Sequence, residues 1–178
     1  SKDYIRDNIK SNLKMIDHSR FMHRISPHNQ TALIVSGGPY LNIKELKDTI
    51  KENPGCKVVC VKHSYNKLLE NNIKPWACVL LDPRPITGIS THGIMRKDLF
   101  KKVDPSTKFF VASMTDPSVT EHLIKKKADI YGWHAFTESL REEDERGIQI
   151  INNQVHLIDE LGIPQGSTLI TGGTCAAM

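Results

Sequence analysis

Cysteines, aromatic residues and long apolar runs are all scarce in this chain of 178 residues. The four cysteines form no CxxC pair, which argues against a disulfide framework or a zinc site and indicates reduced core thiols in a cytoplasmic protein. The longest uncharged apolar run, Trp76–Leu81, is far shorter than the roughly 20 residues that a membrane helix needs, so we expect no membrane insertion. The balance of 39% apolar and 25% charged residues excludes collagen-like, coiled-coil and disordered chains.

The chain also lacks a large excess of positive or negative charge. The chain has 24 basic and 20 acidic residues, a formal net charge of +4. Its one basic run, Lys125–Lys127, has no interleaved aromatic residues, and the acidic run Glu142–Glu145 opposes it in sign. Single-stranded nucleic acids are bound by aromatic and basic side chains together. We therefore expect no nucleic-acid partner.

The chain divides into two segments. Residues 1–26 are predicted to form an N-terminal helical segment or linker, because apolar residues recur at helical spacing with a break near Asp17. From residue 31 the pattern changes to short apolar runs, each typical of a buried strand. These runs are Ala32–Val35, Val58–Val61, Trp76–Leu81, Phe109–Ala112, Ile130–Trp133 and Thr168–Ile170.

Amphipathic stretches separate the apolar runs and are predicted to be helices. They are Ile43–Glu52 with Asn42 as its cap, Ser64–Asn71, Arg96–Lys102, and Ser118–Lys127 with Ser118 as its cap. The alternation predicts an α/β domain over residues 31–178: a Rossmann-like, doubly wound, mostly parallel sheet of about six strands with helices on both faces. Over Gly147–Gln165 the pattern leaves strand and helix open.

The chain ends in small residues that suit the first turn of a helix following a strand. Because that helix is absent, we expect the domain to be truncated at its carboxyl end, with room for further domains in a longer chain.

Polar and glycine-rich residues follow each predicted strand, where the loops of a parallel sheet converge on a ligand. The sharpest segment is the turn Ser36–Gly37–Gly38–Pro39, whose glycines would let backbone amides approach the phosphate of a nucleotide. The turn fits neither the GxGxxG dinucleotide pattern nor a Walker loop. A tight turn without a ligand is the alternative.

Charged residues after the other strands complete the predicted site. Asp82 could hold Mg²⁺ or act in catalysis, although a turn-capping role is the alternative. Arg84 could neutralise a diphosphate or be a surface residue, and His63 could contact a ribose or base. Asp116 faces the same edge but suits a turn, and His134 is a candidate general base or a structural histidine. The late turn adds Gly172, Gly173 and Thr174 as candidate phosphate contacts.

Three stretches, "ALIVSGGPYLN", "VVCVKHSYNKLLENNIKPWACVLLDPRP" and "TLITGGTCAAM", resemble the MptE-like domain. This family includes archaeal 6-hydroxymethylpterin diphosphokinases and motility-associated flagellin glycosyltransferases, and is distantly similar to bacterial sialyltransferases. The resemblance implies a Rossmann-like fold and places the late glycine turn near the nucleotide or acceptor. Tyr40 stands for the usual serine, Asn72 for glycine and Trp76 for aspartate.

We therefore expect a nucleotide-dependent transferase domain that binds ATP or a nucleotide-activated sugar. Glycosyl transfer is favoured because Asn72 and Trp76 depart from the pattern expected of the pterin enzymes. One alternative is a Mg²⁺-dependent diphosphokinase that transfers diphosphate from ATP to a pterin-like alcohol. Another is a non-catalytic module of a larger protein that binds a nucleotide or sugar.

Overall fold

The computed structural model describes residues 2–22, 26, 28–86 and 99–135, together with the backbone of three short segments at 142–143, 149–150 and 168–169. All structural statements below concern these residues.

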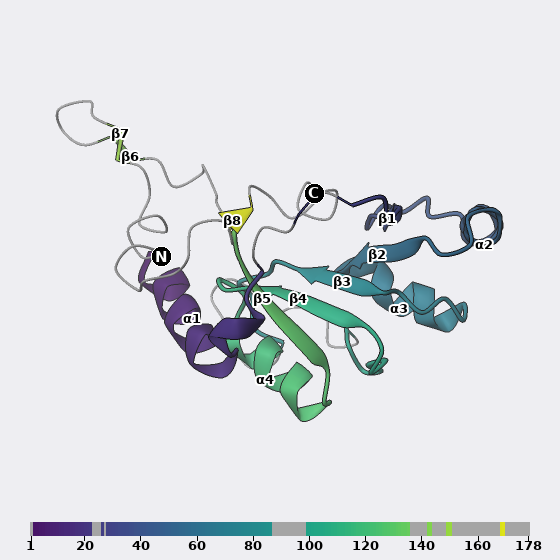
Figure 1. Ribbon diagram of the computed structural model, residues 1–178. Helices are drawn as coiled ribbons and strands as arrows, with labels where there is room; N and C mark the ends of the chain where they lie inside the picture. Colours follow the sequence, from purple (N-terminus) through teal and green to yellow (C-terminus); the bar gives the residue numbers. More distant parts are fainter. Residues whose placement is uncertain are drawn as a thin grey trace.

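The centre of the molecule is a parallel sheet (Figure 1). Its strands lie in the order β1-β2-β3-β4-β5-β8, and each neighbouring pair is parallel. The α/β class and the sheet of about six strands are thus confirmed. The strands are β1 (Ala32–Val35), β2 (Lys57–Val61), β3 (Ala77–Leu80), β4 (Lys108–Ala112), β5 (Asp129–Ala135) and β8 (Thr168–Leu169).

A separate antiparallel pair lies in the region around the stretch that the sequence left open. It consists of β6 (Glu142–Glu143) and β7 (Gln149–Ile150). Ile150, one of the isoleucines after Gly147, therefore lies in a short strand.

The helices are α1 (Lys2–Met15), α2 (Ile43–Glu52), α3 (Lys62–Glu70) and α4 (Pro117–Lys125), with a 3₁₀ turn, η1 (His18–Arg20), after α1. Asn42 caps α2 as predicted: its side-chain oxygen accepts hydrogen bonds from the amides of Lys44 and Glu45 at 3.1 and 3.2 Å. The break after the first helix is also confirmed.

Three details of the helix prediction are wrong. The cap of α4 is Asp116 and not Ser118, because Pro117 occupies the first helical position and the Asp116 carboxylate accepts the Ser118 amide at 2.9 Å. Helix α3 begins at Lys62, two residues before the expected start. The described part of the stretch Arg96–Lys102 forms a turn, in which Phe100 is fully buried with a positive φ of 58°.

The strand order runs across the sheet without reversal. Crossover connections of one hand that all advance in the same direction leave their helices on one face of the sheet. Leu46 of α2, Leu68 of α3 and Leu123 of α4 accordingly share one core cluster with Cys60 and Phe109 of the strands. Helix α1 packs beside α4 (Figure 1).

Cysteine placement in the core agrees with the sequence. Cys60 and Cys78 are neighbours in the register of β2 and β3, fully buried and not bonded to each other. Burial raises the pKa of the Cys78 thiol well above its ordinary value, which keeps it protonated and unreactive. Cys56 is half-buried, and Cys175 lies outside the described residues. No helix in the described part of the chain combines the length and apolarity needed to cross a membrane.

Candidate functional site

The glycine turn after β1 lies against His63, the second residue of α3. A Cβ atom at Gly37 would be 3.0 Å from the Cβ of His63, a tight contact that a larger residue could make only if one of the two segments shifted slightly. Gly38 has open space around it, and the turn from Ser36 to Pro39 is exposed. The carboxyl ends of β1 and β2 therefore meet as predicted, and the backbone of the turn is accessible to a ligand.

Asp82 is held by two cations at the carboxyl end of β3. Its carboxylate pairs with the Lys62 ammonium and accepts two bonds from the Arg84 guanidinium, at 2.9 and 2.7 Å. The Arg84 backbone amide adds a third bond at 3.0 Å. The side chains of Asp82 and Lys62 are 3% and 10% exposed, whereas that of Arg84 is 43% exposed. Arg84 is therefore the member of this ion cluster that is accessible to solvent.

The charges of the cluster do not cancel. Burial by itself would raise the pKa of Asp82, but the hydrogen bonds from Arg84 and Lys62 outweigh it and lower that pKa to about 2. Burial lowers the pKa of Lys62, while its bond to Asp82 works in the opposite direction. With Lys62 charged, two cations face one carboxylate. Of the two cations, Arg84 is the one that solvent reaches, so its guanidinium is the group that an anionic ligand can contact.

Mg²⁺ fits poorly at Asp82. Both oxygens of this carboxylate are bonded to cations, so a metal ion would have to displace Lys62 or Arg84. In the described ranges, no group of three or more histidine, cysteine, aspartate or glutamate side chains is arranged to hold a metal. That Asp82 binds Mg²⁺ or takes part in catalysis stays a prediction, and its contacts favour a role in holding the two cations.

Asp116 belongs to the same part of the molecule. Its backbone amide donates to the carbonyl oxygen of Asp82 at 3.0 Å, which joins the loops after β3 and β4. One carboxylate oxygen caps α4 through Ser118, and the other accepts the Tyr4 hydroxyl at 2.7 Å. Tyr4 also contacts the carbonyl oxygen of Pro83. The geometry gives Asp116 a capping and linking role; a catalytic role stays a prediction.

Helix α1 supplies three polar contacts that sequence reasoning missed. Tyr4, Asn8 and Asn12 lie four residues apart on one side of the helix, and all three bond to the loops at this edge. The signal was visible in the sequence, because the three side chains form a polar stripe parallel to the apolar stripe that predicted the helix.

His134 lies near the end of β5 but is buried. Its Nδ1 is 2.7 Å from the Ser113 hydroxyl, and its ring stacks on Phe21 with centroids 4.9 Å apart. Among the described residues, none forms a hydrogen bond with the buried Nε2 atom. Burial lowers the pKa of His134 to about 4, so the ring is neutral at pH 7. This environment suits a structural histidine, and its role as a general base stays a prediction.

The departures from the family pattern fall in two different places. Tyr40, at the glycine turn, is 95% exposed. Asn72 and Trp76 line a pocket at the amino ends of the strands, away from the glycine turn and Asp82. Asn72 adopts a left-handed φ of 60°, a conformation that glycine favours and asparagine tolerates. Gly172, Gly173 and Thr174 lie outside the described residues.

No curated protein and no solved structure matches the chain significantly. A family model described as "6-hydroxymethylpterin diphosphokinase MptE-like" matches residues 4–165. The matched range includes the glycine turn, the ion cluster and the polar stripe of α1, so the chain belongs to the MptE-like family.

Proposed function

We propose that this protein is a nucleotide-dependent transferase that moves a diphosphoryl group from ATP to the hydroxyl of a pterin-like alcohol. The observation that carries the proposal is the solvent-exposed Arg84 guanidinium, which Asp82 holds beside Lys62 near the accessible glycine turn. Lysine and arginine both bind phosphate, and backbone amides of a glycine turn bind it without side-chain obstruction.

The position of Asn72 and Trp76 supports our preference for diphosphoryl transfer. Their departure from the family pattern was the reason to favour glycosyl transfer. Both residues line a pocket at the other edge of the sheet, so they say nothing about the substrate bound at the glycine turn. The family description, which names a diphosphokinase, then becomes the stronger guide.

The reaction needs a nucleophile, a leaving group and stabilisation of negative charge. The oxygen of the substrate alcohol attacks the β-phosphorus of ATP, the bond from that phosphorus to the oxygen of the α-phosphate breaks, and AMP leaves. The alcohol proton passes to a base or to solvent. Negative charge accumulates on the departing phosphate, and the half-exposed Arg84 guanidinium is the cation placed to offset it. Asp82 positions that guanidinium through two bonds.

Glycosyl transfer from a nucleotide-activated sugar is the second candidate. Tyr40 favours it, because an almost fully exposed aromatic ring stands at the glycine turn where the family usually has a small serine. The same turn and cations would then hold the diphosphate bridge of the sugar donor, and the nucleotide would be the leaving group.

The test is an assay of nucleotide release by the full chain. We expect ATP and 6-hydroxymethylpterin to give AMP and the pterin diphosphate in equal amounts. Chromatography and ³¹P NMR measure both products. Arg84→Gln should lower kcat/KM at least tenfold, because it removes a charge-assisted bond worth about 1.5–3 kcal/mol. Lys44→Gln, on the exposed first turn of α2, is the matched control and should behave as the wild type.

Other outcomes separate the alternatives. Release of CMP or UDP from nucleotide sugars, without AMP from ATP, would replace the diphosphokinase with a glycosyltransferase. Binding of a nucleotide without release in any arm would leave a binding module and overturn both transfer reactions.

A further inference from the structure

A pocket of about 560 Å³ lies at the edge of the sheet opposite the glycine turn. It opens between α2 and the amino ends of β2 and β3, and Lys57 and Trp76 stand at those two strand starts. Its volume is within the range of about 300–1,000 Å³ that is usual for small-molecule sites. Neither the family resemblance nor the proposed function uses this pocket.

The charge of the lining has one sign. Lys47, Lys57 and Lys74 come from three different segments and all line the pocket, whereas no aspartate or glutamate does. Within the part of the chain that the structure describes, neither Lys47 nor Lys57 has an ion-pair partner. Lys74 reaches Asp104 at 3.3 Å, with its side chain 72% exposed. Two lysines without an ion-pair partner among the described residues therefore line the same pocket.

The uncharged part of the lining contains an aromatic ring. The Trp76 side chain is 37% exposed, and Ile50 and Pro75 supply apolar surface around it. The indole is supported from the sheet, because its ring is 6.3 Å from that of Phe110, which stacks on Tyr131 at 5.3 Å. A planar ligand ring could therefore pack on the free part of the indole.

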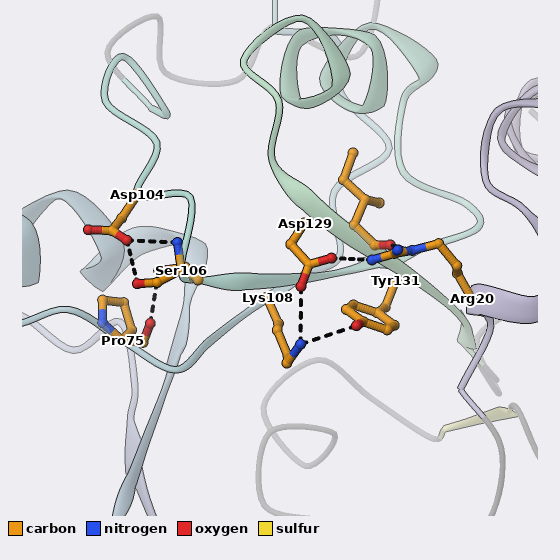
Figure 2. A network of polar contacts seen from close by, with 9 residues as sticks. Arg20, Pro75, Asp104, Ser106, Lys108, Asp129 and Tyr131 are labelled. Atoms are coloured by element: carbon orange, nitrogen blue, oxygen red, sulfur yellow. Dashed lines mark hydrogen bonds and ion pairs between the residues drawn. The ribbon is translucent and has the colours of Figure 1, made fainter.

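The wall beside Trp76 is fixed by hydrogen bonds. The Thr107 hydroxyl donates to the carbonyl oxygen of Pro75 at 2.8 Å, and Asp104 accepts the amide and hydroxyl of Ser106 at 2.9 and 2.5 Å (Figure 2). Pro75 and Ser106 both line the pocket. These hydrogen bonds hold the wall in one arrangement, which lowers the entropic cost of binding.

Positive charge continues along this edge of the sheet. Arg20 and Lys108 share the single carboxylate of Asp129, and both cations lie over the ring of Tyr131, at 4.4 and 4.9 Å from its centroid (Figure 2). This second group also has one positive charge in excess. It extends the field that an approaching anion experiences.

We infer that this pocket, defined by Lys47, Lys57, Lys74 and Trp76, is a second binding site for a phosphorylated small molecule with a planar ring, of the nucleotide class. The lysines bind the phosphates, and the indole packs against the ring. The site is separate from the glycine turn, since the two lie at opposite ends of the same strands, and it does not depend on the proposed transferase activity.

The two tryptophans allow a direct test. Trp76 is partly exposed and Trp133 is fully buried, so quenching of tryptophan fluorescence by an added nucleotide reports on the pocket. We expect ATP, titrated without added metal into the full chain, to quench the emission saturably. Trp76→Phe should abolish that quenching, and the double variant K47Q/K57Q should raise the apparent Kd at least tenfold. Circular dichroism confirms that each variant is folded.

Controls assign the signal to the pocket. Lys44→Gln removes a lysine from the same helix outside the pocket, and Arg84→Gln removes the cation at the other edge; both should leave the quenching curve unchanged. Inorganic pyrophosphate should compete with ATP if the lysines bind phosphate. The inference is overturned if ATP gives no saturable quenching, if K47Q/K57Q leaves the Kd unchanged, or if a single-stranded oligonucleotide binds far more tightly than ATP.

Discussion

His134 shows at the scale of one residue how burial changes both chemistry and stability. The ring is 2% exposed, and burial lowers its pKa to about 4. In the unfolded chain the same group has a pKa near 6.5. Between these two values the unfolded chain binds a proton that the folded chain does not, so the stability contributed by neutral His134 is present above pH 6.5 and is lost as the pH falls toward 4.

We therefore predict that the free energy of unfolding falls by about 2 kcal/mol from His134 alone when the pH is lowered from 7 to 5. Urea denaturation at the two pH values measures this difference, and His134→Gln should remove most of it. Comparing the pH dependence within each variant cancels any constant loss from the substitution. Asp82 does not interfere, because its pKa of about 2 confines its own contribution to lower pH. An unchanged pH dependence in the variant would contradict the assignment.

Asp82 shows why residue roles were only partly predictable. Its place after a buried strand, with Arg84 nearby, could be read from the sequence, and the structure brings both to the same edge. Lys62 is 20 positions away, and it meets Asp82 only because the register pairs Val61 with Val79 in the adjacent strand. An aspartate without visible partners suggests a metal ligand; the same aspartate between two cations favours an anion site.

Among the elements, α1 has the largest effect on the candidate site. Its Asn12 is fully buried and makes three hydrogen bonds: its amide nitrogen donates to the carbonyl oxygens of Ser113 and Thr115 at 2.8 and 2.6 Å, and its oxygen accepts the Thr120 hydroxyl at 2.6 Å. These bonds fix the loop between β4 and α4. That loop carries Asp116, whose amide is bonded to Asp82.

We predict that Asn12→Ala lowers the free energy of unfolding by about 2–4 kcal/mol, because it leaves buried polar groups without partners. It should also speed hydrogen exchange at the Asp116 amide. Asn8→Ala is the matched control, since Asn8 is similarly buried but donates only to the Met114 carbonyl oxygen, at 3.1 Å, among the bonds to this loop. If both variants lose equal stability and the exchange rate stays constant, α1 does not order this loop.

Element prediction succeeded where local chemistry decides and failed where packing decides. The run Ala32–Val35 and the helix Ile43–Glu52 have the predicted bounds, because β-branched residues and an asparagine cap act locally. The start of α4 was misplaced because Asp116 and Ser118 are both good caps, and only the position of Pro117 separates them. The turn at Phe100 depends on burial of that ring against Tyr65 and Phe109, which no local pattern reveals.

In the whole molecule, one parallel sheet separates the edge that holds the glycine turn and Arg84 from the edge that holds the lysine-lined pocket. Parallel strands predicted that the loops after them would meet, and the contacts of Gly37 with His63 and of Asp82 with Asp116 confirm it. The same topology gathers the amino ends of the strands at the opposite edge, where Lys57 and Trp76 line the second pocket. No sequence pattern predicts this pocket, because the lysines that line it are scattered along the chain and come together only in the folded sheet.

This separation leads to a prediction about the stability of the liganded protein. A ligand at a hundred times its Kd adds about 2.7 kcal/mol to the free energy of unfolding, and ligands at two independent sites add their contributions. Excess ATP should therefore raise the Tm through binding at two sites, and each site should contribute its own part of the increase. Arg84→Gln should remove one part and K47Q/K57Q the other, and the combined variant should lose the sum, each relative to its own Tm without ATP. Pyrophosphate should reproduce the contribution of the pocket more weakly, because it lacks the ring that packs on Trp76. A combined loss no greater than that of either variant would mean that ATP occupies one site, and a loss that departs from the sum would mean that the sheet couples its two edges.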